Sequence, residues 1–243
     1  MRWAIPVLPQ FHIPFNRWIA DAVPEVRAYT VIANGKNVLK EHCNMSLTQS
    51  EAASHEVVEH LDGSVTEYSY FDPSEEAMDR LVKTLFESHW RDITVGPCIE
   101  GAVFEVRFSE APKLSILDGY LTVNLGPWHF HLCIAPHRGN RSPELRKARQ
   151  VARVALFETR GAGCGGGRSW GVRMWNGFGE QMTTVFLPNP RLSDEMKLLR
   201  EPNWDRLTLW YKLRREFLGE IPPTDIAQAQ AARGYSGSAT EEH

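Results

Sequence analysis

The sequence contains 243 residues, of which 42% are hydrophobic, 23% charged and 10% aromatic, a composition typical of a folded globular protein. Its 27 Lys and Arg residues against 30 Asp and Glu give a formal charge of −3, so we expect neither nucleic acid nor an anionic membrane surface as a partner. No apolar run reaches the roughly 18 residues that a membrane-spanning helix needs. Four widely spaced cysteines indicate a reducing compartment, and we therefore expect a soluble, cytoplasmic protein.

The chain divides by composition into three parts. Prolines interrupt residues 1–50, which we interpret as an N-terminal extension that packs on the domain. Residues 51–221 carry the helix and strand patterns of a single domain. Residues 222–243 are polar, rich in small side chains and without an apolar period, which predicts a mobile C-terminal tail.

The first half of the domain begins with a predicted hairpin in residues 55–71. Its Asp62-Gly63 pair is the dipeptide that a type I′ turn prefers. A helix with Asp72 as its cap follows, because apolar residues recur after it at steps of three and four. Residues 101–110 then alternate between apolar and polar side chains, which predicts a strand.

The second half begins with a long strand in residues 119–135, broken at Gly126-Pro127 because proline cannot donate to a central ladder. A helix is predicted from its cap at Ser142 to a stop at Gly161. Two extended runs in residues 169–190 surround a glycine-containing loop and predict a hairpin. A last helix runs from Asn203 to a glycine stop at residue 219.

This order of elements favours an α+β fold with a mainly antiparallel sheet and helices packed on one face. For residues 97–218 we predict a ferredoxin-like arrangement of these elements.

The segment WHFHLCI, residues 128–134, is the strongest candidate for chemistry. Alternation on a strand places Trp128 and Phe130 on an apolar face and His129 and His131 on the opposite face. The two histidine backbones are then separated by roughly 6.5–7 Å, and their imidazoles can converge on one metal ion. The alternative is that both histidines are polar residues on a half-solvated sheet face.

A third ligand is needed, and His137 and Glu180 are the candidates. The hairpin pattern places Arg173 and Glu180 on one face of the ribbon, where they either serve the site or form a cross-strand ion pair. In the functional interpretation His129, His131 and His137 bind zinc or iron, Glu180 is a ligand or general base, and Arg173 orients an anionic substrate. Nearby tryptophans suit an aromatic substrate.

Two further features favour a structural interpretation. Cys133 follows the histidine pair and is predicted to be a buried, inert thiol rather than a ligand or nucleophile. The glycine-rich segment 161–167 follows a predicted helix instead of opening one, so we interpret it as a helix stop and surface loop rather than a phosphate loop.

The motif WHFHLCIAPHRG and the motif SWGVRMWNGFGEQMTTVFLPNP resemble a family of uncharacterised bacterial proteins. The resemblance covers residues 97–218 and implies that the histidine strand and the GEQ hairpin belong to one compact unit. It implies no activity and no cofactor.

The leading hypothesis is a small metal-dependent enzyme, either a hydrolase or lyase or a non-haem iron oxygenase, acting on a small, aromatic or anionic substrate at the polar face of the sheet. The alternatives are a non-catalytic module that binds a ligand or haem, and a structural protein whose open sheet face is an interface. A homodimer fits the last alternative.

Overall fold

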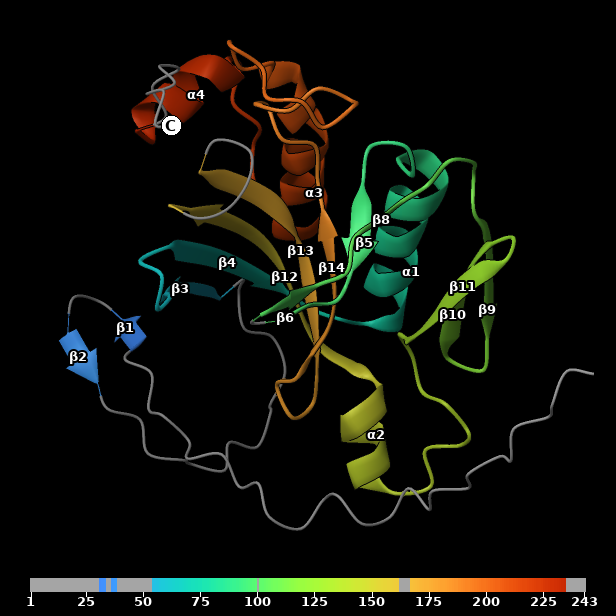
Figure 1. Ribbon diagram of the computed structural model, residues 1–243. Coiled ribbons are helices and arrows are strands. Elements are labelled where there is room, and N and C mark those ends of the chain that lie inside the picture. Colours follow the sequence, from blue (N-terminus) through green and yellow to red (C-terminus); the bar gives the residue numbers. More distant parts are fainter. Residues whose placement is uncertain (1–30, 34–35, 39–53, 100, 162–166, 235–243) are drawn as a thin grey trace, which may run out of the picture. The chain divides into compact units, whose positions relative to one another are not determined.

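The computed structural model describes residues 31–33, 36–38, 54–99, 101–161 and 167–234 (Figure 1). The chain forms two units, residues 1–44 and 45–243. In the first, strands β1 (Val31–Ala33) and β2 (Lys36–Val38) pair antiparallel. All other described elements belong to the second unit. The prediction that residues 1–50 pack on the domain concerns residues that lie largely outside the described ones.

The second unit is built on a seven-stranded antiparallel sheet with the order β3-β4-β12-β13-β14-β5-β8 (Figure 1). Its strands are β3 (His55–Glu59), β4 (Val65–Phe71), β5 (Thr94–Gly96), β8 (Val106–Arg107), β12 (Val151–Arg160), β13 (Arg168–Asn176) and β14 (Gln181–Phe186). A separate three-stranded sheet has the order β11-β10-β9, with β9 (Lys113–Leu117), β10 (Tyr120–Leu125) and β11 (Trp128–Cys133). The strands β6 (Cys98–Ile99) and β7 (Ala102–Val103) form a small hairpin.

The helices are α1 (Glu75–Lys83), which continues as the π-helix η1 (Thr84–Ser88), α2 (Pro143–Arg149), the 3-10 helix η2 (Trp204–Leu207), α3 (Thr208–Leu218) and α4 (Ile226–Ala232). Of these, α1 and α3 cover one face of the large sheet, whereas α2 has no buried residue and lies beyond the ends of the strands (Figure 1). The helix α1 connects β4 on one side of the β12–β14 meander to β5 on the other side, so it must cross the sheet.

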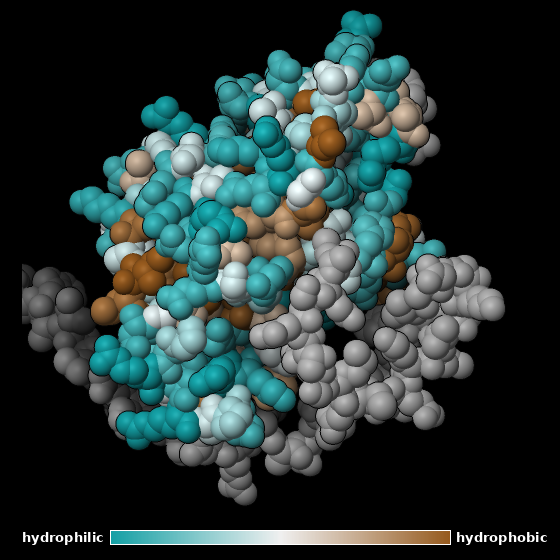
Figure 2. Space-filling view, turned by 180° about the vertical axis from the view of Figure 1, so that it is seen from behind, coloured by the Kyte–Doolittle hydropathy of each residue, from teal (hydrophilic) through white to brown (hydrophobic). Residues whose placement is uncertain are grey.

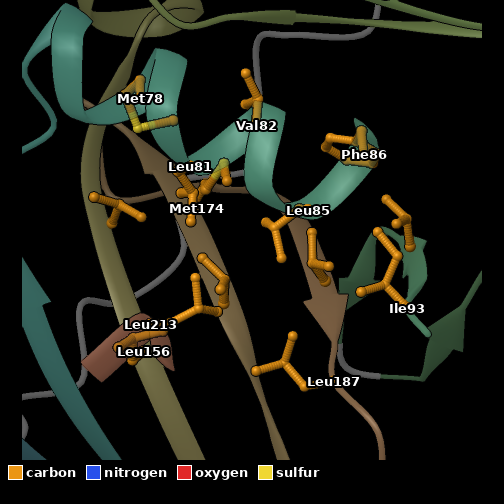
Figure 3. Close-up of a cluster of buried hydrophobic side chains, with 14 of the residues drawn as sticks. Met78, Leu81, Val82, Leu85, Phe86, Ile93, Leu156, Met174, Leu187 and Leu213 are labelled. Atoms are coloured by element: carbon orange, nitrogen blue, oxygen red, sulfur yellow. The ribbon is translucent and has the colours of Figure 1, made fainter. Parts of the chain in front are cut away.

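The main core lies between α1, α3 and this face of the sheet. Figure 3 shows Leu81, Leu85, Leu156, Met174 and Leu213 from these elements gathered in one cluster, and each of them is fully buried. Burial of one such side chain stabilises the fold by about 1.5–3 kcal/mol. The apolar stripe that predicted the first and last helices is therefore the surface that packs on the sheet.

The opposite face of the sheet has a second, smaller cluster. Tyr68, Ala155 and Phe157 are buried in it, and Tyr70 and Trp175 pack against it. Because β12 contributes buried residues to both faces, its sequence is an almost continuous apolar run.

The α+β class with a mainly antiparallel sheet is confirmed. The ferredoxin-like strand order predicted for residues 97–218 is not found. A ferredoxin-like domain interleaves two β-α-β units, whereas here β12, β13 and β14 follow one another as a meander and β9–β11 form a sheet of their own.

The helix predicted from Ser142 to Gly161 is only partly correct. Ser142 does cap α2 by accepting a hydrogen bond from the backbone of Leu145, but the backbone becomes extended at Gln150 and continues as β12. A strand that is buried on both faces cannot be distinguished from a buried helix by periodicity alone. The last helix is correct, since Asn203 caps η2 and Gly219 ends α3 with φ 70°.

Other local predictions need smaller corrections. The cap of α1 is Ser74 rather than Asp72. The hairpin at residues 55–71 exists, but its loop spans residues 60–64 and only Gly63 has a positive φ, so the turn is not type I′. The strand expected in residues 101–110 is divided between β7 and β8. Part of the expected tail forms α4, whose Gln230 is buried and donates to the hydroxyl of Tyr211.

Candidate functional site

The alternation predicted for β11 is confirmed at four residues. Phe130 packs against the main core and Leu132 is buried in it, whereas His129 and His131 are exposed on the other face. The strand lies at an edge of its sheet, where it pairs with β10, and its last residue, Cys133, also forms an isolated bridge with Gln150. Cys133 ends the strand and is buried, as predicted.

The two histidines stand side by side on the exposed face. Their ring centroids are 5.1 Å apart and the rings meet edge to face. The Nδ1 atom of His131 shares a hydrogen bond of 2.8 Å with the hydroxyl of Thr122, the residue opposite it on β10. This bond fixes the ring orientation and directs Nε2 away from β10, so Nε2 can bind a ligand.

Both histidines line a cavity of about 510 Å³ between β11 and the β14-β5-β8 side of the large sheet. Its wall is largely apolar and includes Val95, Val106, Phe108, Phe130, Leu132 and Met182. Phe104 and Trp128 lie at its rim with 65% and 75% of their surface exposed. Figure 2 shows hydrophobic surface, in brown, over the part of the domain where Figure 1 places β9–β11.

The cavity is supported by the π-helical end of α1. Phe86 of η1 is buried, and its ring meets Phe108 and Phe130 edge-on at centroid distances of 6.0 and 5.8 Å. Phe86 therefore connects the strand that carries the histidines to the segment that follows β8. A π-turn at this position is consistent with a functional site, because such turns are frequent at these sites.

A few polar residues also line this apolar cavity. Besides the histidines, they are Arg107 on β8, Ser109 and Glu110 after it, and Thr183 on β14. The guanidinium of Arg107 donates to the backbone carbonyl of Asp194, which holds this side chain in place. An apolar wall with a small number of polar groups is the usual composition of a site for a small organic molecule.

His137 lies away from the histidine pair. Its Nδ1 donates to the backbone oxygen of Asp118 at 2.9 Å and lies 3.0 Å from the Asp118 carboxylate, while its ring meets Tyr120 edge-on. Tyr120 is opposite Cys133, at the far end of β10-β11 from His129. The structure thus brings together His129 and His131 but not His137, and within the described ranges no three His, Cys, Asp or Glu side chains form a group that could hold a metal ion.

Arg173 and Glu180 are also outside the cavity. Arg173 lies on the opposite face of the large sheet, where it donates to the hydroxyls of Tyr68 and Thr184. Glu180 is exposed at the β13-β14 turn and accepts from Asn176 at 2.7 Å. A hairpin with its loop at residues 176–179 would pair Arg173 with Met182, but a bulge between Met174 and Trp175 places Thr184 opposite Arg173.

Cys133 and the glycine-rich segment have structural surroundings. Burial raises the pKa of the Cys133 thiol, which disfavours the reactive thiolate. Gly161 and Gly167 hydrogen-bond to each other and connect β12 to β13, so the segment joins two strands rather than ending a helix. Residues 162–166 lie outside the described residues.

The sequence pattern identifies His129 and His131 but not the other parts of the cavity. Phe86 lies in the apolar stripe of the first predicted helix, and Met182 and Thr183 lie in the predicted hairpin, so neither pattern distinguishes them from other core or strand residues. The sequence does contain one signal for the cavity wall. Phe104, Val106 and Phe108 alternate with polar residues, which places three apolar side chains on one face of an extended segment.

A model for a family of unknown function, DUF7676, matches residues 55–219. The chain belongs to this family. The DUF7676 match begins at the first residue of β3 and ends at the glycine that stops α3, so it contains the large sheet, the cavity and the histidine pair. No curated protein matches the sequence. None of the helices that the structure describes is long and apolar enough to cross a membrane.

Proposed function

We propose that this DUF7676 protein binds a small apolar or aromatic molecule with one anionic group in the cavity between β8 and β11. The observation that carries the proposal is the cavity itself, whose volume of about 510 Å³ falls within the usual range of small-molecule sites. Its apolar wall suits the apolar part of such a molecule. Burial of that part makes the main favourable contribution to the free energy of binding.

The polar groups suggest where the anionic end would lie. Arg107, His129 and His131 can each donate a hydrogen bond, and Arg107 carries a fixed positive charge. Glu110 is the acidic residue of the same wall and disfavours an anion next to it. We therefore orient the anionic group toward the histidine pair and Arg107.

A titration with the fluorescent apolar anion 1-anilinonaphthalene-8-sulfonate tests this proposal. We expect one saturable site in the wild type. Ser109→Trp places a large ring at the cavity wall and should weaken binding by at least about tenfold. The matched variant Ser54→Trp adds the same ring at the exposed residue before β3 and should leave the affinity within about twofold. Equal binding by both variants would contradict the proposed location.

The histidines are tested by a second pair of variants. The double variant His129→Ala/His131→Ala should weaken binding by roughly three- to tenfold, because it removes two donors but leaves the apolar wall. His55→Ala, on the exposed first residue of β3, is the control. If the double variant binds like the control, the anionic group does not lie at the histidine pair.

A metal-dependent enzyme is a second hypothesis, supported by the 5.1 Å separation of the His129 and His131 rings. Two histidines leave open positions on a zinc or iron ion that a bound anion can occupy. Elemental analysis of protein purified without added metal separates the two hypotheses. A stoichiometric metal that His131→Ala removes supports the enzyme, whereas metal-free protein that still binds the probe supports a binding module.

A further inference from the structure

A basic surface segment lies outside the cavity, at and around α2. Residues 138–153 contain a single acidic residue, Glu144, and six basic ones: Arg138, Arg141, Arg146, Lys147, Arg149 and Arg153. All six basic side chains are exposed. The formal charge of −3 for the whole chain conceals this local excess of positive charge.

Within the described residues, most of these basic side chains have no acidic partner. Arg138 pairs with Asp118, and Arg153 pairs with Glu56. Arg141, Arg146, Lys147 and Arg149 form no ion pair with any residue in the described part of the chain. An exposed cluster of unpaired cations attracts a polyanion.

Aromatic rings adjoin the basic segment on the face of the large sheet opposite the main core. The guanidinium of Arg153 lies over Tyr70 at 4.6 Å and over Trp175 at 5.4 Å, and the two ring centroids are 5.9 Å apart. Both rings are half-buried, and 49% of the Arg153 side chain is exposed. Rings and a guanidinium plane arranged in this way offer stacking surfaces for another planar group.

The helix α2 is fixed next to these rings. The backbone amide of Gly177 donates to Lys147 at 2.7 Å, and the side chain of Asn176 donates to Ala148 at 3.0 Å. A Cβ atom at Gly177 would lie 3.0 Å from the Cα atom of Lys147, so the turn and the helix are in close contact. Since Trp175 directly precedes this turn, the cations of α2 and the rings belong to one surface.

We propose that this surface, α2 together with Tyr70, Arg153 and Trp175, binds a short stretch of single-stranded nucleic acid. The cations of α2 contact phosphates, and Trp175 with Arg153 stacks on an unpaired base. A duplex conceals its base faces, so the rings select single strands. The proposal replaces the expectation from net charge that nucleic acid is excluded, and it is independent of the cavity.

Fluorescence anisotropy with labelled mixed-sequence oligonucleotides of about 12 nucleotides tests the proposal. Single-stranded RNA and single-stranded DNA are titrated separately, to determine which of them binds. A duplex of the same sequence is the third probe. At about 50 mM salt we expect saturable binding of at least one single strand that weakens steeply toward about 200 mM. The proposal is overturned if neither single strand binds, or if the duplex binds with the same affinity as the single strands.

Two pairs of variants locate the site on the full-length protein. Arg146→Glu/Lys147→Glu should weaken binding by at least about tenfold, whereas the matched reversal Lys113→Glu/Lys197→Glu on exposed residues elsewhere should change it by less than about twofold. Trp175→Leu should lose about tenfold while Trp175→Phe retains most of the affinity, and thermal melts establish that both fold. Equal effects of the two charge reversals, or equal affinity of the two Trp175 variants, overturn the proposed surface.

Discussion

Phe86 meets Phe130 edge-on with ring centroids 5.8 Å apart, so the π-helical end of α1 fixes the strand that carries His129 and His131. The same ring also contacts Phe108, on the other side of the cavity. One buried side chain thus sets the spacing of the two cavity walls.

We predict that Phe86→Ala affects stability and binding together. Removing a buried phenylalanine should lower the free energy of unfolding by about 3–5 kcal/mol, measured by urea denaturation. It should also weaken the affinity for 1-anilinonaphthalene-8-sulfonate because the walls lose their common support. The control Phe178→Ala removes a ring that is 58% exposed and should change stability by less than about 0.5 kcal/mol.

Gly119 and Gly126 provide a matched pair at the two ends of β10. Both have a positive φ, 80° and 77°, so alanine is strained at either position by about 1 kcal/mol. A Cβ atom at Gly119 would also lie 2.4 Å from the backbone oxygen of Ala135, whereas at Gly126 its nearest neighbour is 3.9 Å away. Gly119→Ala should therefore cost clearly more stability in urea denaturation than Gly126→Ala, and equal costs would contradict the packing of this turn.

A buried ion network attaches α4 and the segment after it to the sheet. The carboxylate of Glu158 is 3% exposed and lies 3.0 Å from Arg168 and 2.7 Å from Arg233. Glu158→Gln should cost about 3 kcal/mol, because it leaves buried positive charge with less compensation, and should make residues near α4 more sensitive to limited proteolysis. Asp79→Asn, which breaks an exposed pair with Lys83, should cost less than about 0.5 kcal/mol. If the two variants lose similar amounts of stability, the Glu158 network contributes no more than an exposed ion pair.

Asp118 should contribute to the acid sensitivity of the fold. A hydrogen bond from the Arg138 backbone, followed by the Arg138 side chain and its charge, lowers the pKa of the Asp118 carboxyl below 3.8. A carboxyl with a lowered folded-state pKa adds stability above its unfolded pKa and loses it as the pH falls. The stability difference between wild type and Asp118→Asn should thus be present at pH 7 and shrink below about pH 4 in urea titrations. Asparagine tolerates the positive φ of 51° at this position, so a pH-independent difference would indicate a cause other than this charge.

The sequence predicted those parts of the fold whose signals are local. Asn203 and Gly219 delimit the last helix, and the alternation of residues 128–132 placed the histidines on the exposed face, because capping and side-chain alternation depend on neighbouring residues alone. The segment after Gln150 was misinterpreted, because burial on both faces of a central strand is a tertiary property.

The candidate site was predictable only in part for the same reason. His129 and His131 share one strand, and their proximity follows from a two-residue spacing. The residue that lies opposite Arg173 on β14 depends on a bulge. The position of His137 depends on the turn at Asp118-Gly119, where both residues have a positive φ. The bulge has no signal in the local pattern. The Asp-Gly dipeptide does indicate the turn, but not its contact with His137, which is 19 residues away.

Trp128 offers the most direct test of the central claim, that the cavity between β8 and β11 binds an apolar anion. Two-dimensional NMR of the indole N–H groups during a titration with 1-naphthoate, with the Trp128 signal assigned by Trp128→Phe, reports on the rim of the cavity. We predict that the Trp128 resonance shifts in a saturable way and that Ser109→Trp abolishes the shift. A saturable shift confined to other indoles, or a Trp128 resonance that does not move while the probe binds, would contradict it.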